Sequence, residues 1–459
     1  MISRRALGVA GIVTSLSLVW FVASVTNEWE RPSISVDWGS NNPSTQPETT
    51  THLQPASGVL PHVENYFQQV FSAGRPAPYA YPALKDTCDH APWRTDDVYL
   101  KCGGMAAGLT SIVSQVKVCL KMALDTGTNI VLPAMPLRDS KNLKDFHFLD
   151  GDAYMTYDKW FDAPHLSEVF GKACPKLKII HPDDLDKKVT VKHHWSISCG
   201  DAWGYRKIHS YFWAGRPFRH FFESKLWELY HKEEAEPTPN IPAKGITVID
   251  IDSEFLIYKI TDDPTHRDLR LWNDLSHVVR FREVPRKITD QILKGLDPEP
   301  FYGVHFRVEN DTIWSSLDNQ LKVDLDALDK AWNKYGNKPG QKKPKVYLAC
   351  GDPHQVERFV EAGKERGWEV THKWRLADTE TTKMINDLAF DFQGAVDMGV
   401  MVRSEFFLGI TGSAFSSTIA NQRDITGRYR GSSFEVVDDE GARTHLFNDL
   451  DADEYACCL

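Results

Sequence analysis

The residues best suited to chemistry lie at 302–311, where the sequence reads Tyr-Gly-Val-His-Phe-Arg-Val-Glu-Asn-Asp. Side chains alternate across a β-strand, so a strand here would place His305, Arg307 and Glu309 on one face and apolar residues on the other. Strands in the core of an α/β sheet are normally apolar on both faces. Polar side chains at the carboxyl end of such a strand indicate a ligand site. The alternative is an edge strand with one face in solvent.

Arg307 makes an anionic ligand the first hypothesis for this site. Arginine keeps its charge and donates two parallel hydrogen bonds from a planar group, which fits a phosphate. The chain of 459 residues carries a net charge of −10, so it has no broad electrostatic attraction for nucleic acid. The pattern therefore predicts a local basic pocket for a phosphate group in an acidic protein.

A glycine pair near the start of the folded part could also approach an anion. Gly103 and Gly104 follow a predicted strand at 98–101 and precede a predicted helix at 109–125, which ends at Gly127. Such a turn lets backbone N–H groups face an anion at a helix N-terminus. An ordinary tight turn is the alternative.

A third candidate segment leads from a strand into a helix at 409–419 and is rich in hydroxyl groups. The N-terminus of a helix presents free N–H groups and the positive end of the dipole. Hydroxyls placed there make a cradle for a diphosphate without a metal ion, although plain helix capping is the alternative. The hydroxyl residues are Ser413, Ser416, Ser417 and Thr418.

Asp250 and Asp252 close a predicted strand at 245–252. An Asp-x-Asp pair can hold the Mn²⁺ of metal-dependent glycosyltransferases, and a simple exit from the strand is the alternative. The sequence contains neither a CxxC…CxxC nor an HExxH pattern, so it predicts no zinc site. Our prediction is that the protein has no metal site.

Strands alternate with helices along both halves of the chain. The content of 42% hydrophobic and 25% charged residues is that of a globular protein, and the alternation implies parallel sheets. The predicted fold is α/β with two Rossmann-like lobes and a boundary near residues 285–300. In the second half, strands are predicted at 301–308, 346–350, 369–372, 406–409 and 434–437, and helices at 325–334, 354–363 and 382–402.

The N-terminus predicts a membrane anchor. Arg4 and Arg5 precede an uncharged run at 6–26, close to the roughly 20 residues that span a bilayer. The flanking arginines favour a cytoplasmic N-terminus, and a cleaved signal peptide is the alternative. The stretch that follows, to about residue 58, is rich in Ser, Thr, Pro and Asn and predicts a flexible stalk.

These features predict a single-pass type II protein of the Golgi or ER membrane with a luminal globular part. The eight cysteines can pair in such a compartment, but one sequence does not give their connectivity. The predicted parts are a cytoplasmic tail and signal-anchor helix (1–26), a stalk and lead-in (27–84), an N-terminal lobe (85–290) and a C-terminal lobe (291–459).

The motifs together resemble the protein O-fucosyltransferase-related superfamily over about residues 97–430. They are Gly103-Gly104, His305-x-Arg307-x-Glu309-x-Asp311 and Gly412-Ser413-x-Phe415-Ser416-Ser417, in this order. The H-x-R-x-E-x-D form is most similar to the plant-type branch. The chain departs from several members in lacking an Asn after the glycines, which bears on how an acceptor would be positioned.

The resemblance implies a GT-B fold, with a donor cleft between two facing lobes, and an inverting, metal-independent transfer that needs no cofactor. The donor would be a nucleotide sugar, GDP-fucose in most members, and the acceptor a protein or glycan hydroxyl. The N-terminal lobe (85–290) would be the acceptor side, and the C-terminal lobe (291–459) would bind the nucleotide sugar. Arg307 would stabilise the leaving diphosphate, and Glu309 would act as the base or hold Arg307. The implied donor-binding residues are His305, Asp311, Gly103, Gly104, Ser413, Phe415, Ser416, Ser417 and Thr418.

Two other functions stay open at this point. One is a metal-dependent glycosyltransferase that uses Asp250 and Asp252. The other is a catalytically silent luminal protein that binds a nucleotide or a glycan.

Overall fold

The computed structural model describes residues 80–105, 108–138, 154–198, 216–252, 267–296, 298–308, 316–333, 339–410, 413–423, 435–437 and 443–446, all in the unit Ala56–Leu459. The predicted anchor and stalk lie outside these residues, as do Glu309 and Asp311 of the first motif. Within the described ranges, none of the helices combines the length and apolar character that a membrane span requires.

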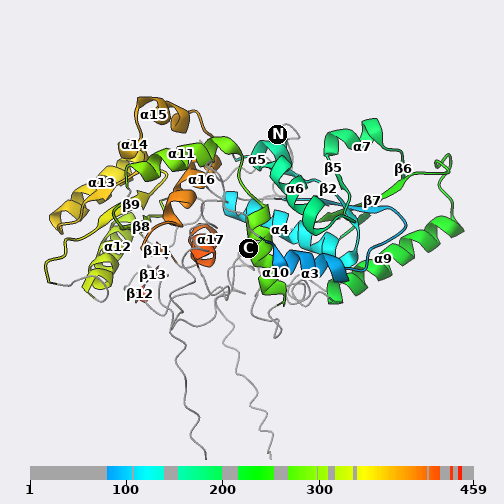
Figure 1. The fold of residues 1–459 in the computed structure, drawn as a ribbon, viewed down its shortest axis with the longest axis horizontal. Helices are drawn as coiled ribbons and strands as arrows, with labels where there is room; N and C mark the ends of the chain where they lie inside the picture. Colours follow the sequence, from blue (N-terminus) through cyan, green and yellow to red (C-terminus); the bar gives the residue numbers. More distant parts are fainter. Residues whose placement is uncertain are drawn as a thin grey trace, which may run out of the picture. The chain divides into compact units, whose positions relative to one another are not determined.

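The first half of the chain builds a sheet of parallel strands in the order β5-β2-β1-β7-β6. Figure 1 labels β2, β5, β6 and β7 among the helices of this half. Lys101 pairs with Asp250 and Gly103 with Asp252, so β1 and β7 end side by side. The strands are β1 (Val98–Gly103), β2 (Asn129–Val131), β5 (Ile179–Ile180), β6 (Val191–Ile197) and β7 (Ile246–Asp252), with a separate hairpin of β3 (Ala134–Pro136) and β4 (Tyr154–Thr156). The helices are α3 (Pro82–His90), α4 (Leu109–Thr126), α5 (Tyr157–Trp160), α6 (Ala163–Ala173), α7 (Pro182–Lys188), α9 (Arg216–Ala235) and α10 (Arg267–Val278).

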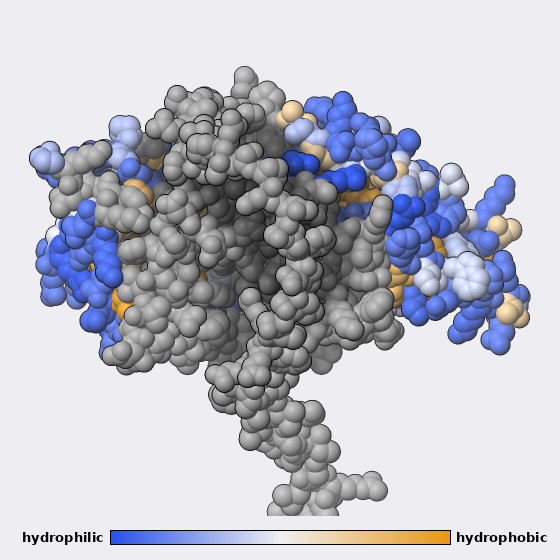
Figure 2. Space-filling model, turned by 90° about the horizontal axis from the view of Figure 1, so that it is seen from below, coloured by the Kyte–Doolittle hydropathy of each residue, from blue (hydrophilic) through white to orange (hydrophobic). Residues whose placement is uncertain are grey.

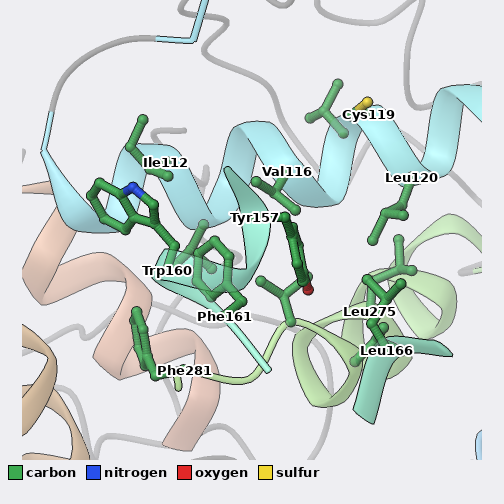
Figure 3. Packing of buried hydrophobic residues seen from close by; sticks show 14 of the residues in the cluster. Ile112, Val116, Cys119, Leu120, Tyr157, Trp160, Phe161, Leu166, Leu275 and Phe281 are labelled. Carbon is green, nitrogen blue, oxygen red and sulfur yellow. The ribbon is translucent and has the colours of Figure 1, made fainter. Parts of the chain in front are cut away.

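Helix α4 is the centre of this half. It begins and ends within one residue of the prediction, and Gly127 ends it in the left-handed conformation (φ 64°) that glycine adopts without strain. Its apolar residues face aromatic side chains from α5 and the segment after it, as Figure 3 shows for Ile112 beside Trp160 and Val116 beside Tyr157. A disulfide between Cys102 and Cys119 ties α4 to β1, and a second disulfide joins Cys88 to Cys174.

The second half builds a mixed sheet in the order β10-β9-β8-β11-β13-β12. Its first four strands are parallel, whereas β13 runs antiparallel to both of its neighbours, β11 and β12. The strands are β8 (Phe301–His305), β9 (Lys345–Ala349), β10 (Val370–Thr371), β11 (Phe406–Ile410), β12 (Glu435–Val437) and β13 (Arg443–Leu446). The helices are α11 (Glu283–Lys294), α12 (Leu317–Ala331), α13 (Pro353–Glu365), α14 (Lys373–Leu376), α15 (Thr379–Asn386), α16 (Phe390–Met401) and α17 (Ala414–Arg423). The described part of the surface in Figure 2 is mostly hydrophilic.

The α/β class and the parallel sheets are confirmed, and strand β8 settles one alternative. All five of its residues are buried between β9 and β11, so the edge-strand interpretation is wrong. The strand is nevertheless shorter than predicted. Its neighbour β9 ends at Ala349, whose carbonyl accepts from Phe306 N–H at 3.0 Å, so the ladder stops there and Arg307 lies beyond the strand.

Other boundaries also differ from the prediction. The long helix expected at 382–402 is two helices, α15 and α16, and the side-chain amide of Gln393 donates to the carbonyl of Leu388 at the break. Helix α12 begins at Leu317 because Ser316 caps it. A further strand, β13, follows the strand that was expected to be the last.

Candidate functional site

The second sheet has a topological switch point between β8 and β11. Strand β8 is followed along the chain by β9 on one side, and β11 is followed by β12 and β13 on the other. In open α/β sheets, ligands bind beyond the carboxyl ends of the strands at such a point. Because β8 ends at His305 and β11 at Ile410, the first and third predicted segments meet at this point.

His305 and Ser416 are in direct contact there. The Nδ1 atom of His305 lies 2.9 Å from Ser416 Oγ, and the same oxygen accepts from Ile410 N–H at 3.1 Å. The ring of Phe415 packs against the imidazole with a centroid distance of 4.6 Å. Burial, and secondarily the charge of Arg307, lower the pKa of His305 to about 3, so the imidazole is neutral at physiological pH.

Gly409 allows Ser416 to approach β11 this closely. A β-carbon at position 409 would lie 2.5 Å from Ser416 Oγ and 2.7 Å from Ser416 Cβ, which no real side chain tolerates. The fully buried Ser416 is therefore packed directly against the strand backbone. Position 409 must therefore be glycine because Ser416 occupies the space of a β-carbon, and not because the backbone turns there.

Arg307 brings positive charge to the same place. Its side chain is half-buried, and its positive charge adds to the effect of burial in lowering the pKa of His305. The preceding residue, Phe306, is fully buried against Phe359 at a centroid distance of 5.4 Å, which anchors the backbone beside Arg307. The switch point therefore combines a neutral imidazole with a permanent cation, a combination suited to an anionic ligand.

The remaining hydroxyl residues of the third segment have different environments. Ser413 and Thr418 are buried, as is Ser416, while the side chain of Ser417 lies outside what the structure describes. Ser416 already uses its oxygen for protein contacts. Direct binding of phosphate by these residues stays a prediction.

The start of α4, which follows the glycine pair along the chain, lies near this point through a chain of contacts. Gly104 has φ +65°, a conformation that favours glycine, and no atom lies within 4 Å of where a β-carbon of Gly103 or Gly104 would be. At the other end of the turn, a β-carbon on Gly394 of α16 would lie 3.5 Å from Leu109 and 3.8 Å from Phe415. The start of α4 and the start of α17 thus approach the same residue of α16.

A buried ion pair, which the sequence did not reveal, holds the start of α4. The N–H of Leu109 donates to Asp391 Oδ1 at 3.2 Å, and the Arg138 guanidinium donates to the same carboxylate, with an Nη2–Oδ1 distance of 2.7 Å. The side chains of Arg138 and Asp391 are 10% and 1% exposed. Arg138 also lies against Gly108, where a β-carbon would be 2.8 Å from its Nη2.

A second buried pair fixes the other end of α16 to the sheet. Asp397 accepts from Lys373 Nζ at 2.6 Å and from the hydroxyl of Tyr347 on β9 at 2.7 Å. Burial raises the pKa of Asp397, against the opposing effect of Lys373. Helix α16 is therefore held to the start of α4 by one carboxylate and to the sheet by another.

The Asp-x-Asp pair lies in the first sheet. Asp250 Oδ2 lies 2.9 Å from His194 Nε2, and Lys101 Nζ lies 3.6 Å from Oδ1. The side chain of Asp252 is outside the described residues. Across the described ranges, no group of three or more His, Cys, Asp or Glu residues is placed to hold a metal ion.

With this geometry established, the chain was compared with known proteins. No protein-family model matches it. O-fucosyltransferase 23 of Arabidopsis thaliana is 30% identical over 145 residues, which cover 30% of this chain and 32% of that protein. The chain resembles the O-fucosyltransferases. The match spans about a third of the length of this curated relative.

Solved structures of fucosyltransferases are also similar. POFUT1 in complex with GDP-fucose has a TM-score of 0.42 and 14% identity, covering 73% of this chain and 96% of that chain. The fucosyltransferase NodZ from Bradyrhizobium has a TM-score of 0.35 and 11% identity, covering 70% and 97%.

Our first prediction concerns the ion pair at the start of α4. Asp391→Ala removes both the partner of a buried guanidinium and the acceptor of Leu109 N–H, so we expect a loss of about 3–5 kcal/mol in the free energy of unfolding. Denaturant unfolding measures it. The matched control is Asp387→Ala, an exposed aspartate just before α16, which should stay within about 0.5 kcal/mol of wild type. Equal stability of the two variants would contradict the role given to Asp391.

The second prediction concerns the loss of folding stability at acidic pH. Between pH 6.5 and about 3, position 305 binds a proton in the unfolded chain but not in the folded one. Stability should therefore fall as pH falls through this window, by up to about 1.4 kcal/mol per pH unit from this group. His305→Gln should reduce the slope of unfolding free energy against pH. An unchanged slope in the variant would show that His305 is not buried as a neutral group.

Proposed function

We propose that the chain is an inverting, metal-independent glycosyltransferase that transfers fucose from GDP-fucose to a hydroxyl of a protein or glycan. The observation that carries this proposal is the meeting of His305, Arg307 and the start of α17 at the switch point of the second sheet. The sequence similarity to a plant O-fucosyltransferase supports the choice of reaction. We further propose that the two sheets form the facing lobes of a GT-B arrangement with the donor between them.

The charges of the site suit the cleavage of a glycosyl–phosphate bond. Negative charge builds on the diphosphate as that bond breaks, and a fixed cation stabilises it most when it is already in place. Arg307 would supply that charge, together with the N-terminus of α17. In an inverting transfer the acceptor oxygen attacks as the diphosphate leaves, and Glu309 is the residue that we predict as base or as support for Arg307.

The proposal needs no divalent cation, because Arg307 would compensate the charge of the diphosphate. The alternative metal site competes with existing contacts, since the Asp250 carboxylate already has His194 and Lys101 as neighbours. A metal-dependent transferase and a silent nucleotide-binding protein nevertheless predict different results in the same experiment.

The third prediction is that Arg307→Ala abolishes donor use. Full-length protein is assayed for hydrolysis and transfer with a panel of GDP- and UDP-sugars in excess EDTA. We expect activity with GDP-fucose, a loss of roughly 10²–10³-fold in Arg307→Ala and poor rescue by Arg307→Lys, whose ammonium lacks the planar fork. The exposed Arg375 on α14 provides the matched control, Arg375→Ala, which should keep wild-type turnover.

Each competing function has its own outcome in this assay. Activity that vanishes in EDTA, returns with Mn²⁺ and is lost in Asp250→Asn would replace the proposal by the metal-dependent transferase. GDP binding without turnover of any sugar would favour the silent protein. Full activity of Arg307→Ala would remove Arg307 from the site.

We also propose that the described part of the chain lies in the lumen of the Golgi or ER, behind an N-terminal anchor. Two disulfides, Cys88–Cys174 and Cys102–Cys119, support an oxidising compartment.

The fourth prediction follows from this location. A tag at the C-terminus should resist protease in sealed microsomes and become sensitive when detergent opens them. A tag digested without detergent would place this part of the chain on the cytoplasmic side and contradict the proposal.

A further inference from the structure

Ser416 has a different environment from a residue that contacts a ligand. It is 0% exposed, whereas a phosphate-binding hydroxyl must reach its ligand. Its oxygen lies between two protein groups, the N–H of Ile410 at 3.1 Å and the Nδ1 of His305 at 2.9 Å. Gly409, where any β-carbon would strike Ser416, keeps this arrangement tight.

The two contacts of Ser416 favour one direction for its proton. The N–H of Ile410 can only donate, so Ser416 Oγ is an acceptor in that bond. The hydroxyl hydrogen is then free to be donated, and His305 Nδ1 is its acceptor among the contacts that the structure describes. A neutral imidazole that accepts at Nδ1 carries its own proton at Nε2.

We propose that Ser416 is a positioning residue, which fixes His305 in the tautomer that presents an N–H at Nε2. His305 would then act as a neutral hydrogen-bond donor at the switch point, and Ser416 would act through it rather than on the ligand. Phe415 restricts the imidazole from its face, since the two ring centroids are 4.6 Å apart. This inference rests on the proposed function for what the N–H meets, namely the oxygens of a nucleoside diphosphate-sugar.

At this position the imidazole of His305 can donate a hydrogen bond only in its uncharged form. Burial opposes a positive charge on the imidazole, and the nearby charge of Arg307 opposes it further. A donor of fixed direction still adds a hydrogen bond to an anion without the cost of burying another cation. The serine supplies that direction, because without it either ring nitrogen could carry the proton.

The tautomer is measured in full-length protein labelled with ¹⁵N-histidine, with His305 assigned by its absence in His305→Gln. We expect the wild-type spectrum to show a protonated Nε2 and an unprotonated Nδ1 at His305. Ser416→Ala should produce a mixture of tautomers. The matched control is Ser404→Ala, a buried serine before β11 whose hydroxyl donates to the Met401 carbonyl at 2.7 Å, and it should leave the His305 signals unchanged.

A second measurement separates a positioning residue from a phosphate ligand. Calorimetric titration with GDP should give Ser416→Ala a dissociation constant within about threefold of wild type, while turnover falls by up to roughly 10²-fold, as misplacement of a reacting group can cause. The effects of Ser416→Ala and His305→Ala on turnover should not add, because both remove one unit.

Other results would contradict a positioning role for Ser416. A protonated Nδ1 in wild type, or a tautomer unchanged by Ser416→Ala, would show that Ser416 does not set the imidazole. A large loss of GDP affinity in Ser416→Ala that adds to that of His305→Ala would make Ser416 a direct ligand. The spectra need no turnover, so they decide the role of Ser416 even if no nucleotide sugar proves to be a substrate.

Discussion

The candidate site depends on the carboxylate of Asp391, which joins parts of the chain that are far apart in sequence. It accepts from the first N–H of α4 and pairs with Arg138, and it stands in the first turn of α16. A buried carboxylate with such partners is costly to displace, since removing one member leaves the others without compensation. The position of the start of α4 relative to α17 follows from this contact, because Gly394 of the same helix lies close to both Leu109 and Phe415.

The candidate site combines two polar side chains, Arg307 and His305, that differ in charge and in burial. Arg307 lies beyond the end of its strand and is half-buried, whereas His305 is the last residue of the strand and is enclosed. The same motif therefore supplies one permanent cation and one neutral polar group from neighbouring positions. An anionic donor needs both, because charge stabilises the leaving group and directed hydrogen bonds orient it.

Local sequence patterns predicted much of the fold and some of the site. Apolar residues at helical spacing and the glycine at the end predicted α4 almost to the residue, and the α/β class followed from the order of the elements. His305 and Ser416 were both named in the sequence, yet their contact was not, because it joins positions 111 residues apart. The strand alternation also placed Arg307 on a strand face, whereas the ladder ends before it, where β9 stops.

Some of the features that the sequence missed are set by long-range contacts. Asp391 looks like any acidic residue in the first turn of a helix, and its partner Arg138 lies 253 residues away. The pairing of Cys88 with Cys174 was undetermined for the same reason, since the two cysteines are 86 residues apart. The single helix expected at 382–402 is divided by a break whose carbonyl is satisfied by a side chain, Gln393, and apolar periodicity gives no sign of that.

We propose that the end of β8, the start of α17 and the start of α4 form one nucleotide site. Hydrogen–deuterium exchange of the full-length protein with and without GDP, in EDTA, can test this. We expect GDP to protect backbone amides at 305–308, 413–418 and 108–112 together, and to leave those of β6 and β7 around Asp250 unchanged. Protection confined to the strands around Asp250, or protection of α4 without the other two segments, would contradict it.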